Sequence, residues 1–509
     1  MNKDKQTIDP WESALAFHHR GQLAEAEAQY WKMLLDQSDN VELLCNLGSA
    51  LSGQQKFNQA ITCYRRAIAI DPDSWRTHSN LGNAFKRLGK LDRAQASYLR
   101  AIAVDNNIAL LHYRLGKILL QKGNSEKAAA SLRKAIELQP DDINAFIALS
   151  AIEEMAEPGQ GRKTLLEGIS RNPGYTKTCP NKALAKPLMF FGLQDCRFRL
   201  TNKNKIKMSG GHFQATELLQ RQYFSKSYYY IASDNLLSDA SSLPSHDLIV
   251  NTIACPDREP HSLETLSRFL QSTAHAPVIN MPEHVMQTTR NANYERLHDH
   301  PGVTFPVTIR AERQHIAQAI QESSLSFPII MRRVGTQTAV SAEKLSCADD
   351  IDGFLDETDG EEFYAIQYIE CRFREKYYRK LRLFCIDGKL YPVVCHIDTE
   401  WNVHGGNRKT LMKQNAWMQD EEKKFLGDFT AYIGPENRRH LEALHSIIKL
   451  DFYGIDFTIK DDGSILIFEL NAAMRHSFVH AKILPYLRPF LNDISNAFRD
   501  MAVRKKVAR

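Results

Sequence analysis

Residues 450–474, LDFYGIDFTIKDDGSILIFELNAAM, contain two runs of alternating apolar residues on either side of the sequence DDG. An acidic residue followed by glycine between two such runs is typical of a β-hairpin turn. If Asp462-Gly463 forms a two-residue loop, Asp456 lies directly opposite Glu469, and Asn471 lies on the same face two residues further along. Two opposed carboxylates, roughly 5 Å apart, repel each other unless a cation lies between them. Because Mg²⁺ prefers carboxylate and amide oxygens, the hairpin predicts a metal site.

The two faces of this hairpin are expected to differ. One face is apolar and belongs against a core; its expected members are Ile455, Phe457, Ile459, Leu466, Phe468 and Leu470. The other face carries the acidic pair together with Ile467, which suggests that this face is partly covered. Taken alone, the acidic pair also fits a merely solvated face, so the upstream motifs have to distinguish the two interpretations.

The pattern D–x₁₂–E–x–N, on a strand that follows Gly454-Ile455, resembles the metal-binding end of the ATP-grasp fold. D-alanine–D-alanine ligase and the ribosomal-protein glutamate ligase belong to that superfamily. The resemblance implies an α+β fold in which Asp456, Glu469 and Asn471 hold one or two Mg²⁺ ions on ATP.

The segment FPIIMR at 327–332 resembles the strand of that fold that ends in a phosphate-binding lysine. This chain has Arg332 there, which keeps the charge but not the compact ammonium group. The family continues with a glycine-rich loop whose backbone N–H groups approach the phosphates. Here the loop at 334–339 contains only Gly335, and the hydroxyls of Thr336 and Thr338 could serve as donors instead.

Two further segments follow in the family's order. YAIQYIE at 364–370 resembles the strand and hinge that hold the adenine, which implies contacts from Gln367, Tyr368 and Ile369; a buried strand is the alternative. YYRKLRLFCIDGK at 377–389 reads as a second hairpin with an Asp-Gly turn, in which Lys380 and Arg382 share a face. The resemblance implies that Arg382, with Lys380 beside it, faces the γ-phosphate and the acyl intermediate; a solvated face is the alternative.

The segment at 396–404 is rich in polar and aromatic residues but lacks a metal-ligand spacing. We interpret it as the substrate side of the cleft, with His404 as a candidate proton acceptor and a structural loop as the alternative. The apolar spacing after Gly434-Pro435 predicts a helix over 436–450.

A pattern recurs every 34 residues in the first third of the chain. Small residues recur at Ala26, Ala60, Ala94 and Ala128, and large ones at Tyr30, Tyr64, Tyr98 and Leu132, with Gly48, Gly82 and Gly116 at a third phase. This resembles the tetratricopeptide repeat, a helix–turn–helix unit of this period. Four repeats are clear from about residue 9 to 140, and a degenerate fifth reads as a cap. Stacked units of this kind offer a concave surface to a peptide or protein.

These signals predict a multidomain chain, in which an all-α tetratricopeptide solenoid precedes an α+β ATP-grasp fold with a small α/β domain between them. The expected parts are repeats at 9–173, a linker at 174–206, a pre-ATP-grasp α/β domain at 207–285, the ATP-grasp domain at 286–498 and a basic tail at 499–509.

The amino-acid composition restricts which kinds of partner and which cellular compartment are expected. Lys and Arg number 65 against 60 Asp and Glu in 509 residues, which is too balanced to indicate nucleic acid, and we interpret the basic tail as a frayed, solvated end. Nine cysteines without a C-x-x-C pair favour a reducing compartment. No run of 18 apolar residues occurs and the first residues lack an apolar signal core, so we expect a cytoplasmic protein away from membranes.

The sequence is thus interpreted as an ATP- and Mg²⁺-dependent carboxylate–amine ligase that forms an amide through an acyl phosphate. Its repeats would recruit a peptide or protein partner, and its substrates would be small-molecule or peptide carboxylates and amines. The main alternative is a non-catalytic repeat scaffold with a silent nucleotide-binding fold, which the single-glycine loop favours. A protein-modifying ligase and a repeat-fused glycosyl- or sulfotransferase are further alternatives; the D–x₁₂–E–x–N hairpin argues against the transferase.

Overall fold

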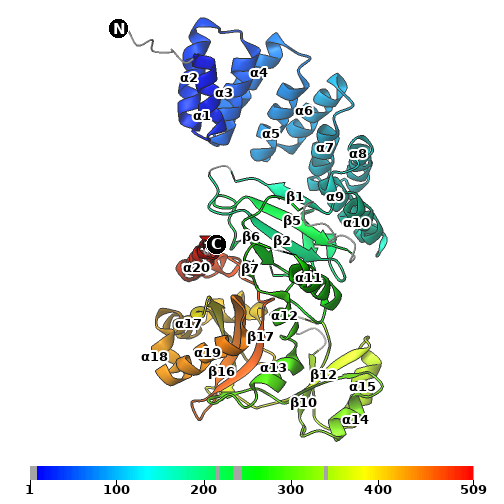
Figure 1. Cartoon of the computed structure of the whole chain (residues 1–509), viewed down its shortest axis with the longest axis vertical. Helices are drawn as coiled ribbons and strands as arrows, with labels where there is room; N and C mark the ends of the chain where they lie inside the picture. Colours follow the sequence, from blue (N-terminus) through cyan, green and yellow to red (C-terminus); the bar gives the residue numbers. More distant parts are fainter. Residues whose placement is uncertain are drawn as a thin grey trace. The chain divides into compact units, whose positions relative to one another are not determined.

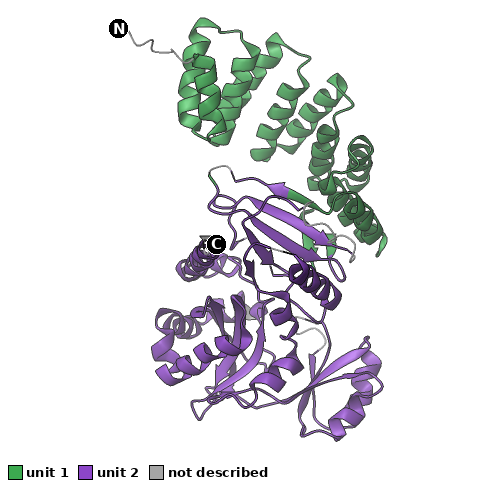
Figure 2. Cartoon of the chain, in the orientation of Figure 1, with its two compact units in different colours: residues 1–175, 180–182, 197–209 green, residues 176–179, 183–196, 210–509 purple. Residues whose placement is uncertain are grey.

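The computed structural model describes residues 9–179, 182–213, 215, 217–232, 243–273, 275–336 and 342–507. The chain divides into two compact units, coloured separately in Figure 2. One comprises residues 1–175, 180–182 and 197–209, and we call it the N-terminal unit. The other comprises residues 176–179, 183–196 and 210–509, and we call it the C-terminal unit.

Most of the N-terminal unit is a helical array of five helix pairs, as the 34-residue period predicts (Figure 1). Its helices are α1 (Pro10–His19), α2 (Leu23–Asp36), α3 (Val41–Gly53), α4 (Phe57–Ile70), α5 (Trp75–Arg87), α6 (Leu91–Val104), α7 (Ala109–Gln121), α8 (Ser125–Leu138), α9 (Ile143–Ala156) and α10 (Gln160–Arg171). A short hairpin of β3 (Arg197–Leu200) and β4 (Ile206–Ser209) completes the unit.

In four of the five pairs, from α3–α4 to α9–α10, the two helices meet where a large side chain lies against a glycine. A Cβ built on Gly82 would lie 2.8 Å from Cε1 of Tyr98, a residue with no exposed surface. The same contact occurs one 34-residue repeat earlier, where a Cβ built on Gly48 would lie 2.6 Å from Cε1 of Tyr64. The repeating Gly and Tyr are therefore two halves of one contact between the helices of a pair.

We expect Gly82→Ala to destabilise the helical array by about 1–2 kcal/mol, because the overpacking cost exceeds the gain in helix propensity. Gly353 in α15 (Asp350–Glu357) is the matched control, since a Cβ there meets nothing within 4 Å. Gly353→Ala should stabilise by about 0.5–1 kcal/mol. Thermal unfolding followed by circular dichroism compares them; an equal rise in both midpoints would contradict the packing.

The expected linker at 174–206 is instead mostly structured. It carries β1 (Gly174–Lys177), β2 (Pro187–Gly192), β3 and the start of β4. Strand β2 is fully buried and pairs in parallel with β5 (Lys226–Ile231) on one side and β6 (Leu248–Asn251) on the other. A fragment that begins after residue 206 would therefore lack a central strand of its first sheet.

The C-terminal unit begins with this parallel sheet, in which β6 also pairs with β7 (Val278–Ile279). Helix α11 (Pro260–Ser272) connects β6 to β7 and contacts β2 and β5, so this part is α/β as the sequence predicts. The short helices α12 (Pro282–Met286) and α13 (Arg290–Leu297) follow.

The second sheet has four antiparallel strands in the order β11-β10-β12-β9. Its elements are β9 (Thr308–Glu312), α14 (Ile316–Gln321), β10 (Ile329–Arg333), β11 (Ala342–Leu345), α15 and β12 (Glu362–Gln367). Helices α14 and α15 lie on one face, where β10 buries Ile329 and Met331 (Figure 1). Strand alternation therefore turns Ile330 and Arg332 toward the opposite face.

The third sheet has the order β13-β14-β16-β17-β8, with β15 paired to β14. Its strands are β8 (Val303–Thr304), β13 (Arg372–Phe373), β14 (Tyr377–Ile386), β15 (Lys389–Asp398), β16 (Phe452–Ile459) and β17 (Ile465–Asn471). The remaining elements are η3 (Gly405–Arg408), α16 (Leu411–Gln414), α17 (Ala416–Gly427), α18 (Phe429–Ile433), α19 (Pro435–Ile448), η4 (His480–Lys482), η5 (Pro485–Leu487) and α20 (Arg488–Val507). Among the described residues, no helix is both long and apolar enough to cross a bilayer.

The hairpin of β16 and β17 has the predicted pairing of the two acids, but its loop length and strand register differ from the prediction. Asp456 does lie opposite Glu469, but Ile459 pairs with Ile465 and Lys460 N–H donates to the Ser464 carbonyl, which leaves three loop residues. A bulge at Phe468 then restores the pairing of the two carboxylates. The two-residue loop was therefore wrong, and so were three face assignments. Ile467 pairs with Phe457 on the core face, whereas Leu466 pairs with Thr458 on the face of Asp456, and Phe468 is partly exposed.

The basic tail is not frayed up to residue 507. It forms the end of α20, and its basic residues reach carboxylates elsewhere in the C-terminal unit. Arg504 pairs with Asp387 at 2.8 Å, and Lys505 pairs with Asp451 at 2.6 Å. Sequence reading treated these charges as solvated because their partners lie more than fifty residues away.

Candidate functional site

Asp456 forms the centre of a buried charge cluster on the third sheet. Strand β14 places Arg382 directly opposite it, and the Arg382 Nε and Nη2 atoms donate to the two carboxylate oxygens at 2.6 and 2.7 Å. Lys380, two residues earlier on the same face, lies 3.4 Å away. Burial alone would raise the pKa of Asp456, but the charges of Arg382 and Lys380 lower it to about 2. The carboxylate is therefore ionised at neutral pH.

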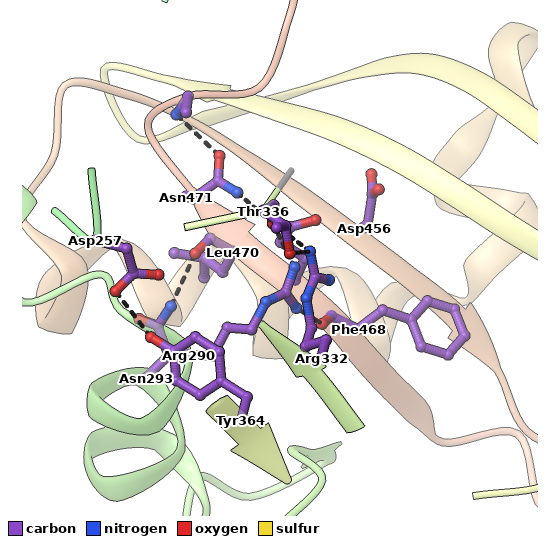
Figure 3. Close-up of polar contacts among 12 residues, drawn as sticks. Asp257, Arg290, Asn293, Arg332, Thr336, Tyr364, Asp456, Phe468, Leu470 and Asn471 are labelled. Atoms are coloured by element: carbon purple, nitrogen blue, oxygen red, sulfur yellow. Dashed lines mark hydrogen bonds and ion pairs between the residues drawn. The ribbon is translucent and has the colours of Figure 1, made fainter. Parts of the chain in front are cut away.

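Glu469 is held by a residue that sequence reasoning missed. Arg290, at the first position of α13, donates to Glu469 Oε1 at 2.7 Å and to the carbonyl of Phe468 at 3.2 Å. Asn293 on the same helix donates to the carbonyl of Leu470 at 2.8 Å, as Figure 3 shows. Helix α13 thus satisfies two carbonyls of β17 beyond Leu466, where the pairing with β8 ends, and it fixes the Glu469 side chain.

One cavity, which we call the first cavity, opens between the second and third sheets. It has about 930 Å³ of empty space, including its opening to solvent. Seven of the nine predicted site residues line it: Arg332, Gln367, Tyr368, Ile369, Lys380, Asp456 and Glu469.

The first cavity has both apolar and charged lining residues. Its apolar lining comes from Pro306, Ile330, Ile366, Ile369, Trp401, Val403, Leu466 and Phe468. Its charged lining comes from Arg290, Arg332, Arg379, Lys380, Asp456 and Glu469. An apolar surface beside a cluster of cations matches a ligand with a flat apolar part and an anionic part.

Arg332 extends from β10 toward the carboxylates of the third sheet. Burial, together with the nearby charge of Arg290, lowers the pKa of Arg332 to about 10, so the side chain still carries its charge at neutral pH. Its guanidinium donates to the backbone carbonyl of Thr336, and at 3.2 Å to the Thr336 hydroxyl (Figure 3). The predicted phosphate loop continues through residues 337–339, which lie outside the described residues.

The predicted adenine contacts lie at the end of β12. Gln367 accepts from the Ser326 N–H at 2.9 Å and donates to the Ser326 carbonyl at 2.8 Å, which ties the hinge to the segment before β10. The ring of Tyr368 meets Trp401 edge to face at 5.9 Å, and the Lys344 ammonium lies 4.2 Å from the Tyr368 ring centroid. Residues far apart in the chain therefore form one aromatic wall.

Two predicted residues lie in neighbouring cavities. Asn471 lines a smaller cavity with Asp257, Arg290 and Glu469, and its amide donates to Glu469 Oε1 at 2.8 Å. Arg382 lines what we call the second cavity, which also includes His396 from β15 and His480 from η4. The Arg382–Asp456 pair consequently stands between the first and second cavities.

His404 is not among the residues that line these cavities. It is exposed, and its Nδ1 accepts from the Gly406 N–H at 3.0 Å, so it caps η3. His396, eight residues earlier, is the buried histidine of this segment and lines the second cavity. In the sequence, only strand alternation could have distinguished the buried His396 from the exposed His404. Alternation does not show that β15 ends at Asp398, between these two residues.

Asp257 is a second residue that the sequence did not indicate. Its carboxylate accepts from the Tyr364 hydroxyl at 2.8 Å (Figure 3). It also accepts from Arg310 at 3.3 Å. Burial raises the pKa of Asp257 even though the hydroxyl and the arginine oppose the shift. It joins a loop of the first sheet to the second sheet.

The predicted metal ligands fit a hard divalent cation in part. Within the described ranges, no three His, Cys, Asp or Glu side chains gather closely enough to hold a metal ion. Asp456, Glu469 and the Asn471 amide supply oxygen donors, and Mg²⁺ normally takes few protein ligands and completes its shell with phosphates and water. The donor set therefore fits Mg²⁺ that arrives with a polyphosphate, but not a metal held by protein alone.

Comparison with known proteins bears on the N-terminal unit. Family models described as TPR repeat and tetratricopeptide repeat match residues 53–89 and 79–143. No curated protein matches the chain. Similar solved structures include MamA (23% identity, 34% of this chain, 96% of that chain, TM-score 0.30) and MamA 41-end from Desulfovibrio magneticus RS-1 (17%, 33%, 96%, 0.31). Another is YrrB, a TPR protein with an unusual peptide-binding site (18%, 33%, 87%, 0.29).

Proposed function

Because the N-terminal region consists of tetratricopeptide repeats, we propose that it recruits a peptide or protein to an ATP-dependent ligase of ATP-grasp type in the C-terminal unit. The observation that carries the proposal is the first cavity. Seven of the nine residues predicted for adenine, phosphate and metal line this one space between two sheets, and they lie on or next to β10, β12, β14, β16 and β17.

The charge balance of this region supports an anionic ligand. Arg290, Arg332, Lys380 and Arg382 surround the two carboxylates Asp456 and Glu469, which leaves two positive charges in excess. Arg379 in the same lining is paired with Glu421 outside it and does not add to this excess. A nucleotide polyphosphate supplies the missing negative charge, and its base fits the apolar part of the cavity. Nucleotide binding thus accounts for both kinds of lining residue.

The proposed reaction has two steps. An oxygen of a substrate carboxylate attacks the γ-phosphorus, the bond to the bridging oxygen breaks, and ADP leaves with the electron pair. An amine nitrogen then attacks the acyl carbon of the acyl phosphate, inorganic phosphate leaves, and the nitrogen loses a proton to give an amide.

The residues of this chain contribute position and charge to those steps. Arg332 and Lys380 would bind the phosphates, and Arg382 would stabilise charge that grows during transfer. Asp456, Glu469 and Asn471 would hold Mg²⁺, which supplies further neutralisation of the phosphate charge.

The direct test is ADP release by the full chain with pools of carboxylates and amines, together with calorimetric titration of ATP. Release that requires both a carboxylate and an amine is the expected result. The second candidate function, a scaffold with a silent nucleotide fold, is favoured by the arginines that already neutralise Asp456 and Glu469. ATP binding without ADP release from any pool would favour that scaffold.

Arg382 gives a sharper test of the chemistry. We expect Arg382→Ala to lower kcat by about 10²–10³ and to change the KM for ATP much less, because its charge acts mainly as the phosphoryl group moves. Arg382→Lys should recover only part of the rate, since the planar donor pair is lost.

The matched control is Arg372→Ala on β13 of the same sheet, where the side chain is 56% exposed. Steady-state kinetics with the three variants decides the matter. A change in KM alone would place Arg382 in ground-state nucleotide binding, and wild-type rates in all variants would remove it from the site.

A further inference from the structure

The second cavity combines cationic and apolar walls. It has about 760 Å³ of empty space, including its opening to solvent. Arg382 and Arg475 supply its guanidinium groups, and His396 and His480 its imidazoles, with no carboxylate in its lining. Its apolar wall is formed by Val393, Val394, Val479, Leu487 and Leu491.

Two groups in this cavity are free to meet a ligand. Among the described residues, none forms a hydrogen bond or ion pair with Arg475, whose residue is exposed. The Nδ1 atom of His480 is buried and has no hydrogen-bond partner among them. Burial and the neighbouring arginines lower the pKa of His480 to about 4, so at neutral pH the ring is neutral and one nitrogen carries a proton that it can donate.

The position of this cavity links it to the first one. Arg382 lines the second cavity and donates twice to Asp456, which lines the first. A group bound against Arg382 would therefore lie across this ion pair from the proposed phosphate site.

We propose that the second cavity binds the substrate acid, and that this acid carries an apolar chain beside its carboxylate. The assignment rests on the proposed ligase function. The carboxylate would lie against Arg475 and Arg382, and the chain against the valines and leucines from β15, η5 and α20. A purely polar acid, such as a short dicarboxylate, would leave the apolar wall without a partner.

The test is calorimetric titration of the full chain with two acids and their matched amides. Octanoate represents a fatty acyl chain, and N-acetyl-leucine represents the end of a peptide; octanamide and N-acetyl-leucinamide lack the charge. We expect at least one acid to bind ten- to a hundredfold more tightly than its amide, because a charged hydrogen bond is lost in the amide. Whichever of the two acids binds shows whether the carboxylate belongs to a fatty acyl chain or to the end of a peptide.

Two variants at the open side of the cavity locate the binding. Arg475→Gln should weaken the acid about tenfold, whereas Arg488→Gln, an exposed arginine outside the lining, should not. Val479→Ser should weaken the same acid a few-fold, because Val479 is 48% exposed and presents apolar surface. Equal affinity for acid and amide, or equal loss in the Arg475 and Arg488 variants, would overturn the assignment.

Titration of ATP in the same samples separates this inference from the ligase proposal. Acid binding without ATP binding would reject the ligase and this cavity's role as its substrate site. ATP binding without discrimination between acid and amide would reject only the substrate class.

Discussion

Glu469→Gln is expected to lower Mg²⁺-dependent ATP turnover by about a thousandfold, because loss of a ligand to the charge-neutralising cation costs several kcal/mol of barrier. The side chain is 27% exposed, so the fold should survive the change. Asp456→Asn should lower turnover as much, but it should also cost about 3 kcal/mol of stability, because Asp456 is 1% exposed and compensates Arg382.

The matched control for both variants is Asp461→Asn, an exposed acid in the turn of the same hairpin. Turnover is measured by ADP release, and folding by circular dichroism on the same preparations. If Glu469→Gln kept turnover within threefold of the wild type, the metal assignment would be wrong.

The second large effect concerns Arg408, which is 1% exposed and pairs with the fully buried Glu422 at 2.6 and 2.8 Å. Glu422 also accepts from the Tyr486 hydroxyl at 2.7 Å and from the Cys395 N–H at 2.9 Å. Arg408→Met should cost about 3–5 kcal/mol, because it leaves a buried carboxylate without its counter-ion. This pair also anchors the segment that carries Trp401 and Val403 into the first cavity.

A double variant tests the cause. Arg408→Met combined with Glu422→Leu should recover much of the lost stability, since an apolar pair can replace a buried ion pair at little net cost. Denaturant unfolding of both single variants and the double variant gives the coupling free energy. Additive losses would mean that each side chain acts through packing and not through the ion pair.

The 34-residue recurrence of residue types and the alternation of apolar residues along strands predicted the parts of the fold that repeat or that face a core. The 34-residue spacing indicated the helix pairs of the N-terminal unit, and alternation located the strands that carry Lys380 and Asp456. The strand that carries Arg332 was predicted from a family resemblance alone. Strand β2 was missed because its four apolar residues, at 188–191, lie within a segment rich in Lys, Pro and Asn, and a window over that composition favours a linker.

The parts of the site that depend on distant packing were not predictable in this way. Arg290 reaches Glu469 across 179 positions, and Asp257 reaches Tyr364 across 107. Neither residue belongs to a local pattern, because each is defined by where its helix or loop lies against a sheet. The pairing of Asp456 with Glu469 was predicted correctly because a longer loop and a bulge offset each other.

That offset has a consequence for sequence comparison. Phe468 is the one extra residue of the bulge and has no partner on β16. Without it, the two strands would pair without interruption, and Asp456 and Glu469 would still lie opposite each other. We expect a chain without it, with eleven residues between the acids, to keep the same opposition and to lose one aromatic from the cavity wall. A search for relatives should therefore allow a one-residue gap here and weigh the two acids above their spacing.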